Sequence, residues 1–197
     1  MDKPQKTRIA IMASGNGTNA QNLIQYFKNH KSIHVVLVIS NRSDAYVLQR
    51  AKGEQVPSMV IQKQDWQDKE KVLSIFKSRD IEFVVLAGYL LLLPSWLVKR
   101  YQGRIINIHP SLLPRYGGKG MYGDKIHKAV IEAGDKLSGI TIHYVNEEYD
   151  KGDIIFQTEC SVDPNDTPDT LAAKIHKLEY EHFPRVAEKI IREKNKA

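Results

Sequence analysis

The sequence predicts an α/β protein with a Rossmann-like, mostly parallel, twisted sheet that carries helices on both faces. Two observations lead to this fold class. Short apolar strands alternate with helical segments over the first half of the 197 residues, and the strand "IHVVLVIS" (33–40) is apolar nearly throughout. Strands buried on both faces read this way, and a repeated strand–helix–strand order is typical of parallel sheets. We expect a single domain, 1–197, made of two halves at about 8–104 and 105–197.

Up to residue 109, the sequence predicts five strands and four helices. "RIAIMA" (8–13) is an apolar strand, "SGNGTN" (14–19) a tight turn, and "AQNLIQYFKNH" (20–30) has apolar residues at helical spacing. The apolar run at 33–40 is followed by a short helix near 44–53 and the strand "SMVI" (58–61). A polar helix near 65–79 precedes the strand "EFVVLAG" (82–88). "PSWLVKRY" (94–101) is typical of a helix with proline in its first turn, and "RIINIH" (104–109) is the fifth strand.

The second half changes character. "RYGGKGMYGDK" (115–125) is glycine-rich and predicts a loop, and a helix near 125–133 follows. Alternating residues predict strands at 139–146 and 153–162, joined by a hairpin-type connection, "EEYDKG". A long helix should run from near 167 to the end of the chain, with "DT" as its cap.

Composition and charge narrow the class of protein. No apolar run approaches the roughly 20 residues of a membrane helix, and "MDKPQKTR" lacks the apolar core of a signal peptide. One cysteine, Cys160, excludes an internal disulfide framework, and its expected role is buried packing. Of the net charge of +6, residues 1–8 hold +2 and residues 188–197 another +2. Most of the excess positive charge therefore lies at the two ends of the chain, which favours solvated tails over a basic binding surface. We expect a cytoplasmic protein with no nucleic-acid or membrane partner.

The turn "SGNGTN" between the first strand and the first helix is a candidate anion site. Backbone N–H groups at a helix N-terminus favour anions, and Gly15 and Gly17 permit positive φ and close approach of a ligand. Ser14, Thr18 and Asn19 add short polar groups. The turn lacks the third glycine of a dinucleotide site and the Gly-Lys-Ser/Thr of a P-loop. It is either a phosphate site, better suited to a monophosphate, or an ordinary βα turn.

Asn107 and His109 form a second candidate site. They are two residues apart on a strand, so they point the same way, and they stand at its C-terminal end, where open α/β sheets bind ligands. Pro110 and Pro114 stiffen the exit from the strand. An amide beside an imidazole suits carbonyl polarisation and proton transfer, but a capped strand end with a structural histidine fits the spacing equally well. A carboxylate such as Asp150 packed against His109 would raise the pKa of the histidine.

The remaining histidines have no partner pattern in the sequence. His143 lies within the strand "TIHYV", where packing or indirect support of the site is expected. His30, His34, His127 and His182 are interpreted as structural or exposed. The spacing of His, Cys, Asp and Glu predicts no metal site.

Several segments together carry a family resemblance. In order, they are "SGNGTN", "VVLAGYLLLL", "INIHPSLLPRY", "GITIHYVNEEYDKGDII" and "LEYEHFP". They closely resemble the phosphoribosylglycinamide formyltransferases, folate-dependent enzymes of purine biosynthesis. "NIHPSLLP" with the later D-x-G marks the wider group of formyltetrahydrofolate formyltransferases. The resemblance spans nearly the whole chain and implies the formyltransferase fold.

The resemblance implies roles for three residues. Asn107 and His109 would stabilise the oxyanion formed when the amine of phosphoribosylglycinamide attacks the formyl carbon of 10-formyltetrahydrofolate. Asp150 would keep His109 protonated or anchor the water that relays a proton to the leaving folate nitrogen. The half at 8–104 would bind phosphate, and the half at 105–197 would carry the catalytic groups and much of the folate site.

The resemblance also implies ligand contacts. For the phosphoribosylglycinamide side they are Gly15, Asn16, Gly17, Thr18, Asn19, Pro110, His176 and Glu179. For the folate side they are Lys69, Leu90, Leu91, Leu92, Leu93, Asn107, Asn146, Glu147, Glu148, Tyr149 and Asp150. Lys69 stands where the family often has an arginine, His176 occupies a position that varies in the family, and the loop at 116–125 is longer than in many members.

Related activities differ from this pattern in testable ways. Methionyl-tRNA formyltransferase carries a further C-terminal RNA-binding domain, and formyltetrahydrofolate deformylase carries a further N-terminal regulatory domain. Neither domain is expected here. Sugar-nucleotide formyltransferases share Asn107, His109 and Asp150, but "SGNGTN" favours a phosphoribosyl ligand. A binding module without catalysis would be expected to lose one of the three residues, and none is lost. We expect no metal and either a monomer or a homodimer.

Overall fold

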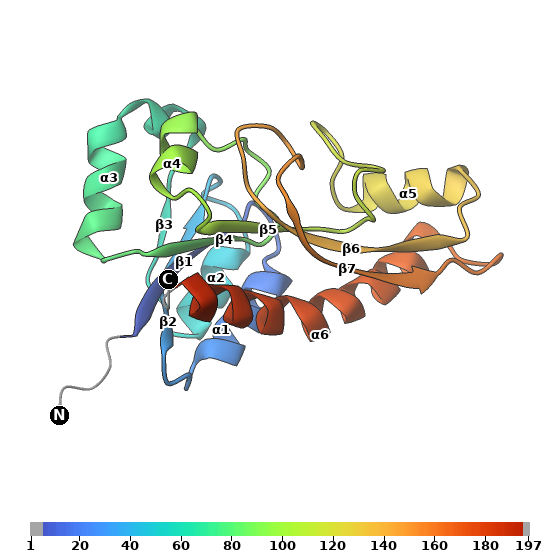
Figure 1. The fold of residues 1–197 in the computed structure, drawn as a ribbon, viewed down its shortest axis with the longest axis horizontal. Helices are drawn as coiled ribbons and strands as arrows, with labels where there is room; N and C mark the ends of the chain where they lie inside the picture. Colours follow the sequence, from blue (N-terminus) through green and yellow to red (C-terminus); the bar gives the residue numbers. More distant parts are fainter. Residues whose placement is uncertain (1–5, 195–197) are drawn as a thin grey trace.

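A single seven-stranded sheet forms the centre of the protein in the computed structural model, which describes residues 6–194 (Figure 1). The strands are β1 (Thr7–Met12), β2 (Ile33–Ser40), β3 (Ser58–Val60), β4 (Phe83–Leu86), β5 (Ile105–His109), β6 (Leu137–Tyr144) and β7 (Ile154–Ser161). Their order is β3-β2-β1-β4-β5-β6-β7. The pairs from β3 through β5 are parallel, and the pairs β5–β6 and β6–β7 are antiparallel. The predicted mostly parallel sheet is confirmed.

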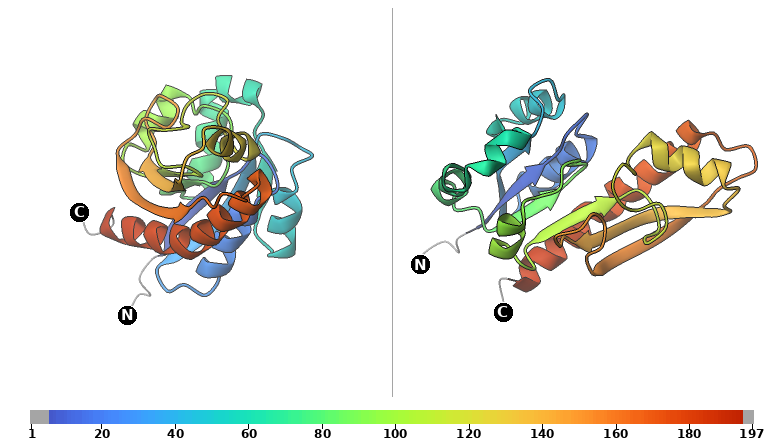
Figure 2. Two further views of the ribbon diagram at one scale, coloured as in Figure 1. Left: turned by 90° about the vertical axis from the view of Figure 1, so that its right-hand side faces the viewer. Right: turned by 90° about the horizontal axis from the view of Figure 1, so that it is seen from above.

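Helices cover both faces of this sheet (Figures 1 and 2). They are α1 (Thr18–Phe27), α2 (Val47–Gly53), α3 (Lys69–Ser78), α4 (Ser95–Arg100), α5 (Asp124–Glu132) and α6 (Pro168–Lys194), with a 3-10 helix at Lys63–Gln67. Part of the predicted basic tails, at 1–5 and 195–197, lies outside the described residues.

The alternation within β1 explains the two-layer packing. Ile9 and Ile11 belong to one core cluster, shared with α1, α2, α5 and α6, whereas Ala10 and Met12 belong to a second, shared with α3 and α4. Successive side chains of a strand point to opposite faces, so one apolar strand supplies both cores. The largely apolar sequences of β1 and β2 therefore suit the centre of the sheet.

Two predicted helices begin differently from expectation. The segment 65–79 splits into the 3-10 helix and α3, because the Asp68 side chain accepts a hydrogen bond from the Lys71 N–H and starts a new helix. Pro94 is the N-cap residue of α4 and precedes its first turn. The predicted cap of α6 includes Thr167, whose hydroxyl accepts a hydrogen bond from the Thr170 N–H at 3.3 Å.

The parallel part of the sheet fixes where a site can form. Strands β1, β4 and β5 end side by side, and their C-terminal ends lead into the turn at 14–17, the segment at 87–94 and the segment after His109. Ligands of open α/β sheets bind at this edge. Long helix α6 runs beneath the sheet and brings residues from the end of the chain to the same edge (Figure 1).

Candidate active site

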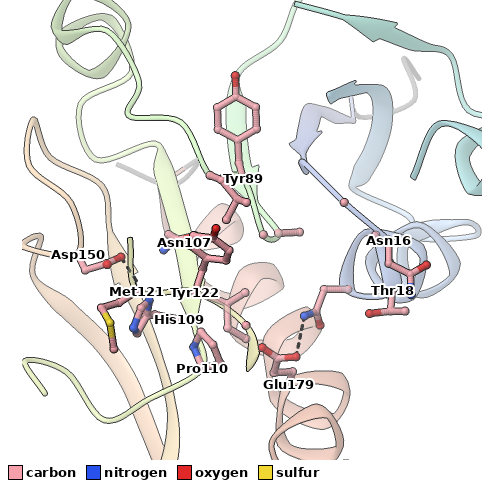
Figure 3. A pocket seen from close by; sticks show the side chains of 18 of the residues that line it. Asn16, Thr18, Tyr89, Asn107, His109, Pro110, Met121, Tyr122, Asp150 and Glu179 are labelled. Carbon is pink, nitrogen blue, oxygen red and sulfur yellow. Dashed lines mark hydrogen bonds and ion pairs between the residues drawn. The ribbon is translucent and has the colours of Figure 1, made fainter. Parts of the chain in front are cut away.

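A cavity of about 310 Å³ lies at the C-terminal ends of β1, β4 and β5. Its size is at the lower end of the range for small-molecule sites. Five segments line it: the β1–α1 turn, the residues after β4, the end of β5, the glycine-rich loop at 118–123 with α5, and the β6–β7 connection; α6 adds a wall. Figure 3 shows Asn107 near the middle, with Asn16 and Thr18 to one side and Asp150 to the other.

The β1–α1 turn presents unpaired N–H groups to this cavity. Gly17 is the N-cap of α1, has φ of 75° and provides no side chain to cap the helix, so the first-turn N–H groups remain available to an anion. Of the two glycines that permit positive φ, Gly17 adopts it and Gly15 does not. Arg50 holds the turn from outside, because its Nε donates to the Asn16 carbonyl at 2.8 Å and its Nη2 to the Asn16 side chain at 2.9 Å.

Asn107 is oriented by a residue of the neighbouring strand. Antiparallel pairing sets His143 of β6 directly opposite Asn107 of β5. Nδ1 of His143 lies 2.8 Å from the Tyr144 carbonyl and must donate to it, which leaves Nε2 as an acceptor for the Asn107 amide at 3.0 Å. The Asn107 amide nitrogen has a second N–H, which this contact with His143 does not use. Because Asn107 lines the cavity, that N–H is a candidate donor to a ligand.

His109 is buried and has a protein group at each ring nitrogen. Nε2 lies 2.8 Å from the Tyr116 carbonyl, which can only accept, so this nitrogen carries a hydrogen. Nδ1 lies 3.5 Å from Oδ1 of Asp150, and Oδ2 of Asp150 accepts from the Gly118 N–H at 2.8 Å. Asp150 also lies 3.6 Å from Nε2 of His143, so one carboxylate faces two imidazoles.

The expected rise in the pKa of His109 does not occur. Burial lowers the pKa of His109 below its ordinary value and outweighs Asp150, which acts in the opposite direction. Burial opposes ionisation of Asp150 too, but the neighbouring His143 and His109 rings and the Gly118 N–H together leave the pKa of Asp150 below its ordinary value. In the protein without substrate, we therefore describe the pair as a neutral imidazole beside a carboxylate.

Glu179 of α6 closes the cavity on the side of the glycine turn. Its Oε2 accepts from the Asn19 amide at 2.8 Å and lies 2.9 Å from Nδ1 of His176. The hydrogen bond to Glu179 raises the pKa of His176. Glu179 is buried, and a buried carboxylate is costly unless it is hydrogen-bonded. The contacts with Asn19 and His176 offset that cost.

The segment predicted to bind folate lies beside a second, smaller cavity. This cavity, of about 50 Å³, touches Leu91, Leu92 and Leu93 and shares Tyr89, Asn107, Tyr149 and Asp150 with the first. Two main-chain donors of this segment are already used: the Leu90 N–H bonds to Oγ of Ser14, and the Leu92 N–H to Oη of Tyr149.

The predicted site residues divide by position. Those lining one of the two cavities are Gly15, Asn16, Gly17, Thr18, Asn19, Leu90, Leu91, Leu92, Leu93, Asn107, His109, Pro110, Glu148, Tyr149, Asp150, His176 and Glu179. Lys69 at the start of α3, and Asn146 and Glu147 in the β6–β7 connection, line neither. Their ligand contacts stay predictions.

Among the residues near the site without an assigned contact from the sequence, three bear directly on its polar contacts. His143 supports Asn107, the Tyr116 carbonyl fixes the hydrogen of His109, and His127 lines the cavity instead of being merely structural or exposed. For His143 a signal existed, because strand alternation places it on the same face as Asn107 once the pairing of β5 and β6 is known. Among the described residues, no three His, Cys, Asp or Glu side chains are grouped as a possible metal site.

Comparison with known proteins places the chain in a family. Residues 7–187 match the model of the formyl transferase family. The chain belongs to the formyl transferase family. This confirms the family and enzyme class predicted from the sequence. Among residues 6–194, no helix is both long and apolar enough to cross a membrane.

Named relatives of this formyl transferase are similar over most of its length. The chloroplastic phosphoribosylglycinamide formyltransferases of Arabidopsis thaliana and Vigna unguiculata are 38% and 37% identical to it, over 98% and 96% of this chain. The chain spans 68% and 62% of those two plant proteins. The crystal structure of phosphoribosylglycinamide formyltransferase from Bacillus halodurans is 38% identical and superposes with a TM-score of 0.84, covering 94% of this chain and 95% of that one.

Proposed function

We propose that this formyl transferase moves the formyl group of 10-formyltetrahydrofolate to the amine of phosphoribosylglycinamide, a step of purine biosynthesis. One observation carries the proposal: a glycine turn suited to a phosphate and the pair Asn107 and His109 line the same cavity. The names of the plant and Bacillus relatives support this choice of substrates. The products would be formylated phosphoribosylglycinamide and tetrahydrofolate.

Asn107 is the proposed donor to the formyl oxygen. As the amine attacks the formyl carbon, negative charge develops on this oxygen, and a fixed N–H donor lowers the barrier. One N–H of the Asn107 amide is held by His143, which fixes the plane of the amide and keeps its donor side facing the cavity. The attacking amine must lose a proton, and the leaving folate nitrogen must gain one.

His109 is the proposed carrier of that proton. Its Nε2 already bears a hydrogen, so Nδ1 is the nitrogen that accepts. The imidazolium so formed would face Asp150 at 3.5 Å, and the carboxylate would stabilise it until the proton passes to the folate nitrogen. Because His109 is neutral before the reaction, it can act first as base and then as acid.

The two substrates would approach from opposite sides of Asn107. We infer that the phosphate binds at Gly15–Asn19 and the N-terminus of α1, where the first-turn N–H groups of the helix have no side-chain cap. The sugar would lie against His176 and Glu179, and the glycinamide against Pro110. The folate would use main-chain groups of Leu90–Leu93 and of the β6–β7 connection, which requires the Tyr149 contact to Leu92 to open. As inferred from the sequence, the protein is cytoplasmic, works as a monomer or homodimer, and binds no nucleic acid or membrane.

A formyl-transfer assay tests this function. The protein is supplied with 10-formyltetrahydrofolate and, in separate reactions, with phosphoribosylglycinamide, an amino sugar nucleotide or no acceptor, while release of tetrahydrofolate is followed. We expect release only with phosphoribosylglycinamide. Release without an acceptor would identify a deformylase, and release with the sugar nucleotide alone would replace the proposed acceptor.

A further inference from the structure

His127 of α5 is a buried histidine without a hydrogen-bond partner. Three histidines among residues 6–194 are buried, and two of them have a protein group at both ring nitrogens: His109 and His143. His127 is 2% exposed, its Nδ1 is buried with no partner, and no hydrogen bond to its side chain is formed within the described residues. Buried polar side chains are nearly always paired, so this one needs an explanation.

The position of His127 indicates what it could pair with. Its side chain lines the cavity, and the packing of α5 against α6 brings it near His176 and Glu179. Glu179 is bonded to Asn19 in the first turn of α1, so His127 stands on the same side of the cavity as the anion-binding turn. We propose that His127 binds the phosphoribosyl end of the acceptor substrate by donating a ring N–H to one of its oxygens. This deepens the proposed function and rests on it.

The local charges favour a neutral donor at this place. Burial lowers the pKa of His127, with His176 acting in the same direction, while Glu179 and Asp124 act against it. A neutral imidazole still has one N–H to donate, and it avoids a second positive charge beside His176. A sugar phosphate offers only oxygen atoms at this end, all of which can accept. A ring N–H bonded to such an oxygen would give the imidazole a partner that it lacks among the described residues.

The test measures binding of ribose 5-phosphate, which contains the phosphoribosyl end and cannot be formylated. We expect His127→Phe, which keeps a ring and removes both nitrogens, to weaken its binding roughly 10- to 100-fold, the usual effect of losing a hydrogen bond to a charged group. His127→Gln, which restores an N–H, should bind within a few-fold of the natural protein. The same Phe variant should raise KM for phosphoribosylglycinamide and leave KM for the formyl donor unchanged.

Controls separate binding from folding. His182→Phe alters a half-buried histidine of α6 that lines neither cavity and should leave ribose 5-phosphate binding unchanged. The melting temperature of the His127→Phe variant should be at least as high as that of the natural protein, because the change removes an unpaired buried polar group. Equal binding by the natural protein and a folded His127→Phe variant would overturn the proposal, as would failure of the natural protein to bind ribose 5-phosphate.

The outcome is independent of the formyl-transfer assay. If phosphoribosylglycinamide is not formylated but ribose 5-phosphate binds in a His127-dependent way, the proposed reaction fails and this binding role stands. If turnover occurs and His127→Phe changes neither binding nor KM, the reaction stands and the role of His127 is refuted.

Discussion

At the scale of single residues, His109 shows how surrounding groups define one chemical role. The Tyr116 carbonyl accepts a hydrogen bond from Nε2, so this nitrogen carries a hydrogen. Burial lowers the pKa of the ring and keeps it neutral. Asp150 lies beside Nδ1, the nitrogen that would be protonated. Sequence spacing placed Asn107 and His109 on one face, and the resemblance named Asp150. Neither could reveal the Tyr116 contact, which depends on a loop conformation. The His143 contact follows from strand alternation only once the pairing of β5 and β6, across 36 residues, is known.

Replacing His109 tests its proposed role in proton transfer. His109→Ala should lower kcat on the order of 10²- to 10⁴-fold, the usual contribution of a positioned acid or base, with KM for either substrate changed only a few-fold. Steady-state kinetics with both substrates varied measures this. His34→Ala, at an exposed position of β2, serves as the matched control and should match the natural protein. An unchanged kcat in His109→Ala would remove His109 from the mechanism.

At the scale of elements, the β1–α1 turn depends on one glycine. A Cβ at position 17 would overlap the Val47 side chain of α2, and φ of 75° disfavours any other residue by roughly 1–2 kcal/mol. Gly17→Ala should therefore displace the first turn of α1, raise KM for phosphoribosylglycinamide at least tenfold and lower the melting temperature. Gly53→Ala, at the open end of α2, is the control and should change neither. A Gly17→Ala protein with normal KM would contradict the phosphate role of the turn.

The β6–β7 connection is a second element whose contacts lead to a prediction. Oη of Tyr149 accepts a hydrogen bond from the Leu92 N–H, a group that the folate is proposed to use. Tyr149→Phe removes this competing acceptor, so it should tighten binding of the formyl donor by up to about tenfold, the worth of one neutral hydrogen bond. Fluorescence or calorimetric titration measures it.

Tyr26→Phe is the control for this titration, because its hydroxyl bonds Glu188 away from both cavities. Weaker binding of the formyl donor by Tyr149→Phe would show instead that the Tyr149 hydroxyl itself contacts the ligand.

Elements were easier to predict than their exact ends. The apolar strands β2 and β5 and the helix α1 follow directly from hydrophobic spacing. The break at Asp68 was missed because the whole segment 65–79 has polar helical character, and only the side-chain cap reveals the boundary. The sequence showed that Gly15 and Gly17 both permit positive φ, and the structure uses this freedom at Gly17, where a Cβ would also overlap Val47 of α2.

At the scale of the whole molecule, the parallel sheet and α6 gather the site from distant parts of the chain. The sheet order joins the turn after β1 to the ends of β4 and β5, and α6 adds His176 and Glu179 beneath them. The parallel order was predictable from the strand–helix rhythm. The packing of α5 and of the first turn of α1 against α6 was not predictable from the sequence. The sequence therefore offered no reason to connect His127 with the site.

The buried histidines make stability depend on pH. The folded-state pKa values of His109 and His127 lie below the unfolded value of about 6.5, so the unfolded chain binds more protons in that window. Their contribution is complete above pH 6.5 and is lost as the pH falls through the folded values. His176 has a raised pKa, so its contribution is complete below about pH 6.5 and is lost as the pH rises through the folded value.

We therefore expect the free energy of unfolding to be greatest near neutral pH and to fall on the acid side. Denaturant unfolding at a series of pH values measures it, and His127→Phe should flatten the acid side while His176→Ala flattens the alkaline side. A free energy of unfolding that increases between pH 7 and pH 5.5 would contradict this assignment of the neutral histidines.

The most direct measurement of the central claim follows the formyl group itself. The natural protein and the Asn107→Ala variant are each mixed with phosphoribosylglycinamide and with 10-formyltetrahydrofolate labelled in the formyl carbon. The protein is in excess over the labelled donor, so that a single turnover is observed, and the position of the label is then determined. We predict that the label appears on the amine of phosphoribosylglycinamide, on the order of 10²-fold more slowly in Asn107→Ala. Label released as free formate, or transfer at the same rate in both proteins, would contradict the account.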